Sequence, residues 1–158
     1  NYFYFGDNKN VPYGDKSSGE IIDLSKNIVK FLLKKDIDFF VVACNTISVV
    51  AIDELRKTCD KKFISITDQG VEELIKKDGD AFVMATRATC LKHGYKEKIS
   101  KLSDKKVFEQ ACPSLVSFIE QGIVSGRELN SDLKEYLAFA NQKKNQEYNF
   151  GLHPLSNY

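Results

Sequence analysis

A thiol, an amide and a hydroxyl stand side by side at Cys44, Asn45 and Thr46, directly after the most hydrophobic segment of the chain. If a helix begins behind them, its exposed N–H groups can hold a carboxylate, and its dipole lowers the pKa of a thiol. This triplet is therefore a candidate site for a small acid and a reactive thiol. The alternative is a small buried hydrophobic residue at a strand end, which spacing alone favours by about two to one.

Other candidate residues also follow predicted strands. Thr86 and Thr89 come directly after the apolar segment 81–85, where the more common role of a threonine is to cap a helix. The segment 12–14 contains a proline and a glycine, so a plain turn is its simplest interpretation. Cys112 precedes Pro113 at another strand-to-helix junction, where the ordinary role of a cysteine is packing. None of these residues identifies a function by itself.

Composition excludes several classes of protein. The chain has 158 residues, with 42% hydrophobic residues, 28% charged residues and a formal net charge of +1, as in a globular protein. This balance predicts no nucleic-acid or membrane surface, and the apolar run 37–44 is too short to span a bilayer. Four cysteines without CxxC spacing and two histidines argue against a zinc site. We expect free thiols in a reducing cytoplasm.

Short apolar segments alternate with amphipathic ones, which predicts an α/β fold with parallel strands and right-handed crossovers. Strands are expected at 2–5, 37–43, 63–66, 81–85 and 107–110. Helices are expected at 17–35, 48–58, 71–77, 88–102, 113–121 and 128–143. The segment 37–43 reads as a central strand buried on both faces. Ligands of such folds bind beyond the carboxyl ends of the strands.

Four groups of motifs occur in the order and spacing of a known family. They are Tyr4–Asp7 with Val11–Gly14 and Lys16-Ser17; Val41–Thr46 with Ser48; Ala85–Thr89 with Tyr95; and Gln110–Pro113 with Leu115-Val116, Ile119-Glu120 and Gly122. Together they resemble the cofactor-independent amino-acid racemases of the aspartate/glutamate racemase superfamily, and most of all the bacterial glutamate racemases. The resemblance covers the chain from about residue 2 to residue 128.

The resemblance implies two lobes with parallel sheets flanked by helices, and a ligand cleft between the lobes. We expect residues 1–70 to form the first lobe, which bears Cys44, and residues 71–158 to form the second. The linker candidate is the polar segment Thr67 to Gly70, which follows a predicted strand. The resemblance further implies a small-molecule substrate, glutamate, no cofactor and no metal, a role in peptidoglycan synthesis, and a homodimer as an option.

The resemblance also assigns roles to individual residues. In the family's two-base mechanism one cysteine thiolate removes the α-proton and the thiol of the other returns a proton to the opposite face, and Cys44 matches the first cysteine. The residues that match positions binding the substrate or lying near it are Tyr13, Gly14, Asn45, Thr46, Thr86, Thr89, Glu120 and His153. Glu120 corresponds to an acid near the second cysteine.

The sequence departs from the family in two places. The family's opening strand and its Asp-Ser turn have no counterpart here, and the place of the second catalytic cysteine, 150–155, reads Phe-Gly-Leu-His-Pro-Leu. Cys112 matches a different family cysteine. We therefore expect a chain incomplete at both ends, with little or no racemase activity as written. The alternatives are a non-catalytic relic or ligand-binding fragment and an aspartate racemase. A doubly wound nucleotide-binding domain lacks support, because no glycine-rich phosphate loop is present.

Overall fold

The computed structural model describes residues 2–150, and the side chains of residues 2–142. Four strands are present in this part: β1 (Phe39–Val42), β2 (Lys62–Ser65), β3 (Ala81–Ala85) and β4 (Val107–Ala111). The helices are η1 (Tyr13–Asp15), α1 (Ser18–Leu32), α2 (Asn45–Val50), α3 (Ile52–Arg56), α4 (Ile66–Ile75), α5 (Arg87–Leu91), α6 (Gly94–Ser100), α7 (Pro113–Glu120) and α8 (Arg127–Phe150). Strands and helices alternate, as the sequence predicts.

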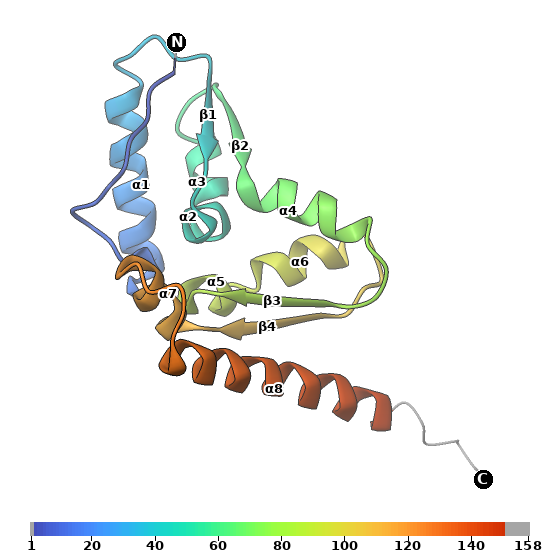
Figure 1. Ribbon diagram of the computed structural model, residues 1–158. Helices are drawn as coiled ribbons and strands as arrows, with labels where there is room; N and C mark the ends of the chain where they lie inside the picture. Colours follow the sequence, from blue (N-terminus) through green and yellow to red (C-terminus); the bar gives the residue numbers. More distant parts are fainter. Residues whose placement is uncertain (1, 151–158) are drawn as a thin grey trace.

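The strands form two separate parallel pairs, and this confirms the predicted α/β fold. β1 pairs with β2, with Phe40 opposite Phe63, and β3 pairs with β4, with Ala85 opposite Ala111. Helix α4 leads from the first pair to the second (Figure 1). The carboxyl ends of β1 and β3 are followed directly by α2 and α5, and these two helices contact each other. The ends of two different sheets thus come together.

Helix α1 begins with a complete capping box. The Ser17 hydroxyl accepts from the Glu20 N–H, and the Glu20 carboxylate accepts from the Ser17 N–H, as the sequence predicts. Ile21, Ser25 and Val29 follow at intervals of four residues and are buried, so one stripe of α1 faces the first sheet. The Ser25 hydroxyl donates to the carbonyl of Ile21, which satisfies the one polar group in this stripe.

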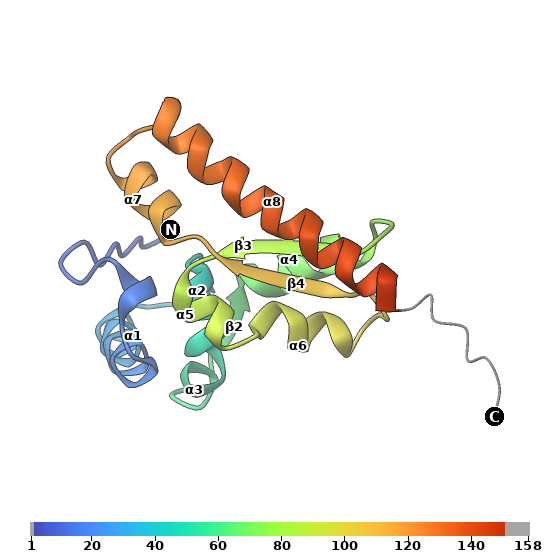
Figure 2. The same cartoon turned by 90° about the horizontal axis from the view of Figure 1, so that it is seen from below.

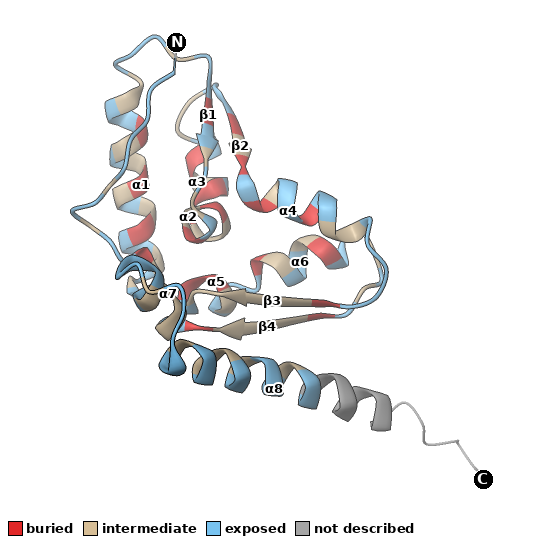
Figure 3. Ribbon diagram, in the orientation of Figure 1, coloured by how far each residue is buried: buried red, intermediate tan, exposed pale blue. Residues whose placement is uncertain are grey.

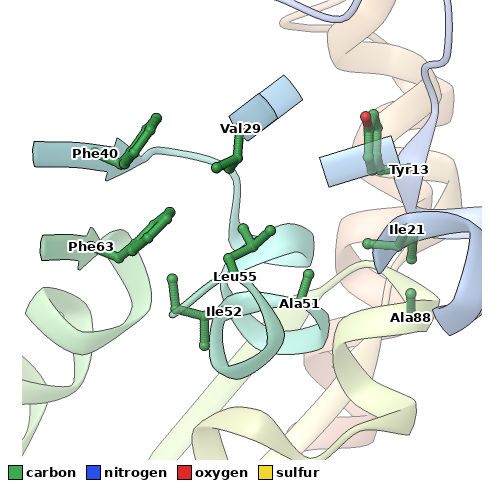
Figure 4. Packing of buried hydrophobic residues seen from close by; sticks show 9 residues of the cluster. All are labelled: Tyr13, Ile21, Val29, Phe40, Ala51, Ile52, Leu55, Phe63 and Ala88. Atoms are coloured by element: carbon green, nitrogen blue, oxygen red, sulfur yellow. The ribbon is translucent and has the colours of Figure 1, made fainter. Parts of the chain in front are cut away.

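The main core lies between α1, α2, α3 and the β1–β2 pair (Figures 3 and 4). The Phe40 and Phe63 rings stack with their centroids 4.7 Å apart, and Ile52 and Leu55 of α3 are nearly inaccessible to solvent. Tyr13 and Ala88, which are far apart in the sequence, belong to the same cluster. Burial of each such large side chain contributes about 1.5–3 kcal/mol. The loop around Tyr13 and the start of α5 therefore pack against the same core.

The second sheet is covered on both faces. Helices α5 and α6 lie on one face of the β3–β4 pair and α8 lies on the other (Figures 1 and 2). A smaller cluster of Val71, Ala81, Ile99 and Val107 lies between α4, α6 and this sheet. Among the described residues, no helix is both long and apolar enough to cross a membrane.

The first sheet corrects the prediction of a strand buried on both faces. In β1, Phe40 is buried, but Phe39 and Val41 are 51% and 63% exposed. Within the described residues β1 pairs with β2 alone, and the two strands are covered on one face only. Side chains alternate between the faces of a strand, so the uncovered face leaves every second residue of β1 in solvent.

The predicted strand at 2–5 is also wrong, because these residues have no regular structure. Their aromatic side chains are exposed to different degrees, from 41% for Phe5 to 93% for Tyr2. The Phe5 ring packs against Phe31 of α1 at a centroid distance of 5.6 Å. This segment therefore lies along a helix and has no strand partner.

Several predicted boundaries differ from the structure. The predicted linker 67–70 is helical and lies inside α4, while the division into lobes at residue 70 stays a prediction. The predicted helix 88–102 is divided into α5 and α6 at His93, whose φ of 49° is left-handed. The predicted helix 48–58 begins earlier, at Asn45, and breaks at Ala51 into α2 and α3.

Candidate functional site

Cys44 lies where the chain leaves β1 and enters α2. Its backbone is extended, with φ −90° and ψ 120°, and it is the N-cap residue of α2. Ser48 fixes this turn, because its N–H donates to the Cys44 carbonyl at 2.9 Å and its hydroxyl donates to the Val42 carbonyl at 3.1 Å. Ser48 is fully buried, whereas Cys44 is half-buried. The thiol is therefore placed by a rigid turn and remains accessible.

Three threonine hydroxyls form a chain between the two sheets. The Thr46 hydroxyl lies 3.0 Å from the Thr86 hydroxyl, which lies 3.0 Å from that of Thr89. The Thr86 oxygen also accepts from the Thr89 N–H, so Thr86 caps α5 as its sequence context indicates. Thr46 and Thr89 are buried. The family resemblance groups these three residues around one ligand. In the structure, the hydroxyl of Thr86 lies within hydrogen-bond distance of both Thr46 and Thr89.

Tyr13 and Gly14 reach the same place from the N-terminal loop. The buried Tyr13 hydroxyl donates to Oδ2 of Asp7 at 2.6 Å. Burial raises the pKa of Tyr13 well above its usual value, and the hydrogen bond to Asp7 and the nearby charges of Asp7 and Cys44 raise it further. Tyr13 therefore stays protonated as a donor to Asp7. The Asn10 side-chain amide also donates to the Asp7 carboxylate, which closes the loop.

Gly14 lies against Thr86 with no room for a side chain. A Cβ atom at Gly14 would be 2.7 Å from Cβ of Thr86, a distance at which one of the two residues must move. A cavity of about 180 Å³ adjoins this contact and is lined by Gly14, Thr86, Arg87 and Glu120, among others. Glu120 therefore shares a cavity with Gly14 and Thr86. Cys44 does not line this cavity.

Asn45 has a partner that sequence reasoning did not assign. Its Oδ1 accepts a hydrogen bond of 2.6 Å from the hydroxyl of Tyr95 in α6. Asp7 belongs to one of the family motifs but has no predicted role, and its carboxylate accepts the hydrogen bond from the Tyr13 hydroxyl. A regular pattern in the sequence could not reveal either contact, because each depends on how separate elements pack. His153, the remaining predicted site residue, lies outside the described residues.

The thiols of the other three cysteines have different surroundings. All four cysteines are free thiols. Cys59 packs against the main core, and Cys112 is buried with its thiol 3.5 Å from the Gln110 carbonyl. Burial raises the pKa of Cys112, and burial and then the charge of Glu109 raise that of Cys90 to about 11. Cys44 is thus the thiol that the fold places beside Asn45 and Thr46.

Metal chemistry has no visible basis in the described part of the chain, where no group of three or more His, Cys, Asp or Glu residues could hold a metal ion. The polar atoms gathered near Cys44 are hydroxyls, an amide and backbone N–H groups. The backbone N–H groups, the hydroxyls and the amide NH₂ can all donate hydrogen bonds, so together they can bind a carboxylate.

Comparison with known proteins shows the family to which the chain belongs. The model of the Asp/Glu/Hydantoin racemase family matches residues 2–145. Glutamate racemases of Persephonella marina and Clostridium perfringens strain SM101 are 37% and 38% identical over 137 and 144 residues, which cover 85% and 87% of this chain. These matches cover 53% and 54% of the two relatives, so the chain spans about half their length.

Solved structures give the same result. One similar structure is the crystal structure of glutamate racemase from Francisella tularensis in complex with D-glutamate. It superposes on this chain with a TM-score of 0.81 and 34% sequence identity, and the match covers 86% of this chain and 52% of the racemase chain. The glutamate racemase of Campylobacter jejuni superposes with a TM-score of 0.78 and 32% sequence identity. This match covers 83% of this chain and 54% of the racemase chain.

Proposed function

Because this chain belongs to the Asp/Glu/Hydantoin racemase family, we propose that it carries the Cys44 half of a glutamate racemase site. The observation that carries the proposal is the Thr46–Thr86 hydroxyl contact, which brings the residues after β1 and β3 to one point. Gly14 meets Thr86 at the same point. Glutamate racemases are the curated relatives and the structural neighbours that the chain resembles.

Proton removal is the difficult step of this reaction. The α-proton of an amino acid lies next to a carboxylate, so negative charge builds up where charge is already present. Preorganised donors stabilise such a charge, and in a site that excludes water they act strongly. Asn45, Thr46 and the backbone at Gly14 supply donors in our proposal. They hold the carboxylate while the Cys44 thiolate takes the proton from the α-carbon.

Cys44 is a suitable base for this step. The thiolate is the reactive form of cysteine, and it can accept a proton from carbon. The C–H bond breaks, its electron pair stays on the α-carbon, and the proton forms an S–H bond at Cys44. The reverse step restores the same enantiomer. Inversion needs a second acid on the opposite face.

No second thiol stands beside Cys44 among the described residues. Cys112 is 3% exposed and Cys90 lines a different cavity, with His93 and Glu109. We therefore propose that this polypeptide catalyses exchange of the α-proton from one face without inversion.

Glutamate is the proposed substrate, and aspartate, which has a shorter side chain, is the alternative substrate. The same proposal places the protein in the cytoplasm, since its cysteines are free, while a homodimer stays a prediction.

Exchange in heavy water tests this proposal. Each enantiomer of glutamate is incubated with the 158-residue chain in D₂O, and the α-proton signal is followed by NMR. We expect loss of the signal from one enantiomer, no loss with Cys44→Ala, and slower loss from aspartate. Cys59→Ala is the matched control, because Cys59 packs against the core away from the site. Equal, negligible exchange with the parent chain and Cys44→Ala would refute the catalytic role and favour a protein that only binds its ligand.

A further inference from the structure

Tyr95 forms a hydrogen bond with the side chain of Asn45. Its hydroxyl donates to Asn45 Oδ1 at 2.6 Å, and this contact joins α6 to the first residue of α2. We propose that Tyr95 is a positioning residue, which fixes the Asn45 amide so that its NH₂ group binds a substrate carboxylate. The inference rests on the proposed function, in which Asn45 holds the substrate carboxylate, and it adds Tyr95 as the residue that orients the Asn45 amide.

The close approach of α6 and α2 places Tyr95 for this contact. Gly94, the residue before it, is buried, and a Cβ atom there would lie 2.4 Å from Cγ1 of Val49. A side chain at this position would require either Val49 or α6 to move. Glycine therefore allows the first turn of α6 to lie directly beside the turn that follows Cys44.

The Tyr95 ring is itself held in place. It is half-buried and packs against the cluster that contains Val71 and Ile99. Gly70 lies beside the ring, and a Cβ atom there would be in ordinary van der Waals contact with it, 3.8 Å from the Tyr95 hydroxyl. Burial raises the pKa of Tyr95, so its hydroxyl is protonated and donates at neutral pH.

The far end of α6 is fixed as well. Lys98 forms an ion pair with Asp68 of α4, and its ammonium group also donates to the Thr67 hydroxyl at 3.0 Å. Asp68 in turn pairs with Arg56 of α3 at 3.0 Å. Helix α6 is therefore attached to the first sheet's helices at both ends, and Tyr95 projects from a rigid support.

The hydrogen bond decides which group of Asn45 meets the substrate. An asparagine amide has an oxygen that accepts and an NH₂ group that donates two hydrogen bonds. In this structure the Tyr95 hydroxyl donates to the oxygen, which leaves the NH₂ group as the end that remains for a substrate. A donor can bind a carboxylate, whereas it repels an ammonium group, so Tyr95 makes Asn45 selective for the acid end of an amino acid.

A double-mutant cycle measures this coupling. D-glutamate binding to the 158-residue chain is measured by calorimetry for the parent, Tyr95→Phe, Asn45→Ala and the double variant. We expect Tyr95→Phe to raise Kd by about 2- to 10-fold, as for loss of one hydrogen bond, and to have no further effect once Asn45 is alanine. Tyr136→Phe is the matched control, because its hydroxyl bonds Ser114 at 2.8 Å, away from Asn45. An unchanged Kd, or equal effects of Tyr95→Phe with and without Asn45, would overturn the inference.

A second measurement separates this inference from the proposed function. The side-chain amide resonances of Asn45 are recorded by NMR in the ligand-free chain. They should shift in Tyr95→Phe and stay unchanged in Tyr136→Phe. Unchanged resonances in Tyr95→Phe overturn the inference whatever calorimetry gives. If the resonances shift but the parent chain binds no D-glutamate, the proposed function is overturned and the fixing of the amide by Tyr95 is supported.

Discussion

The Thr46 hydroxyl lies 3.0 Å from the Thr86 hydroxyl, where the segment after β1 meets the segment after β3. Thr46 is 4% exposed, so its hydroxyl depends on Thr86 for a partner. A buried polar group without a partner is costly, and the contact therefore fixes the relative placement of the two sheets at this point. The same two hydroxyls are the ones assigned to the substrate.

Removing the Thr86 hydroxyl should weaken both the fold and the site. In Thr86→Val the Thr46 and Thr89 hydroxyls and the Thr89 N–H lose a partner. We expect the free energy of unfolding in urea to fall by about 1–3 kcal/mol, and D-glutamate affinity to fall with it. Thr58→Val is the control, since the Thr58 hydroxyl bonds the Leu55 carbonyl and the Cys59 sulfur just after α3, away from the site. It should lower stability without changing affinity. Unaltered stability and affinity in Thr86→Val would contradict the contact.

A methyl group at Gly14 should push the N-terminal loop away from Thr86. The added Cβ would be 2.7 Å from Cβ of Thr86, and such overpacking costs about 1–3 kcal/mol. We expect Gly14→Ala to be less stable in thermal unfolding and to bind D-glutamate more weakly. Gly19→Ala is the control, because no atom lies within 4 Å of a Cβ at that position in α1. Equal behaviour of the two variants would show that the loop yields without cost.

The sequence correctly predicted features that depend on interactions between residues close together in the chain. The capping box of α1 depends on Ser17 and Glu20, which are three residues apart, and the structure contains it as predicted. The position of Thr86 after an apolar segment indicated a helix cap, and Thr86 does cap α5. The parallel α/β fold followed from the alternation of apolar and amphipathic segments. Each inference used residues that are close in sequence.

Contacts between distant segments account for the errors. Nothing in the periodicity marks a break at His93, but its ring Nδ1 lies 2.8 Å from Oε2 of Glu109 on β4, and this partner accompanies the left-handed φ of His93. The exposure of Phe39 depends on which strands lie beside β1, and the sequence of β1 does not contain that information. The Tyr95–Asn45 bond likewise arises only when α6 packs against α2.

Acid should remove the contribution of Asp68 to stability. Burial works to raise the pKa of Asp68, but its ion pairs with Lys98 and Arg56 outweigh burial and lower it below the ordinary value of 3.8. The unfolded chain therefore takes up this proton at a higher pH than the folded chain. The contribution is fully present above pH 3.8 and is lost as the pH falls through the lower folded pKa.

Urea unfolding of Asp68→Asn over a pH series checks this expectation. The variant should be less stable than the parent at pH 7 by roughly 1 kcal/mol, the upper end of the range for exposed ion pairs. The difference should shrink below pH 4, where the parent also loses the charge. Glu73→Gln is the control, because the Glu73–Lys76 pair is exposed and should contribute little at any pH. A difference that does not depend on pH would show that charge is not its cause.

The final prediction separates exchange from racemisation. Inversion requires an acid on the face opposite Cys44, and the cysteines outside the site, among them Cys90 and Cys112, lie in other surroundings within the described residues. We therefore expect little or no change in the circular dichroism of L- or D-glutamate incubated with the purified 158-residue chain. The same samples should show α-proton exchange in D₂O that Cys44→Ala abolishes. Robust conversion in both directions, lost in Cys44→Ala, would instead require a second acid in this chain. Cys90→Ala and Cys112→Ala would then show whether either thiol supplies that acid, since only the variant that removes it would retain exchange while losing inversion.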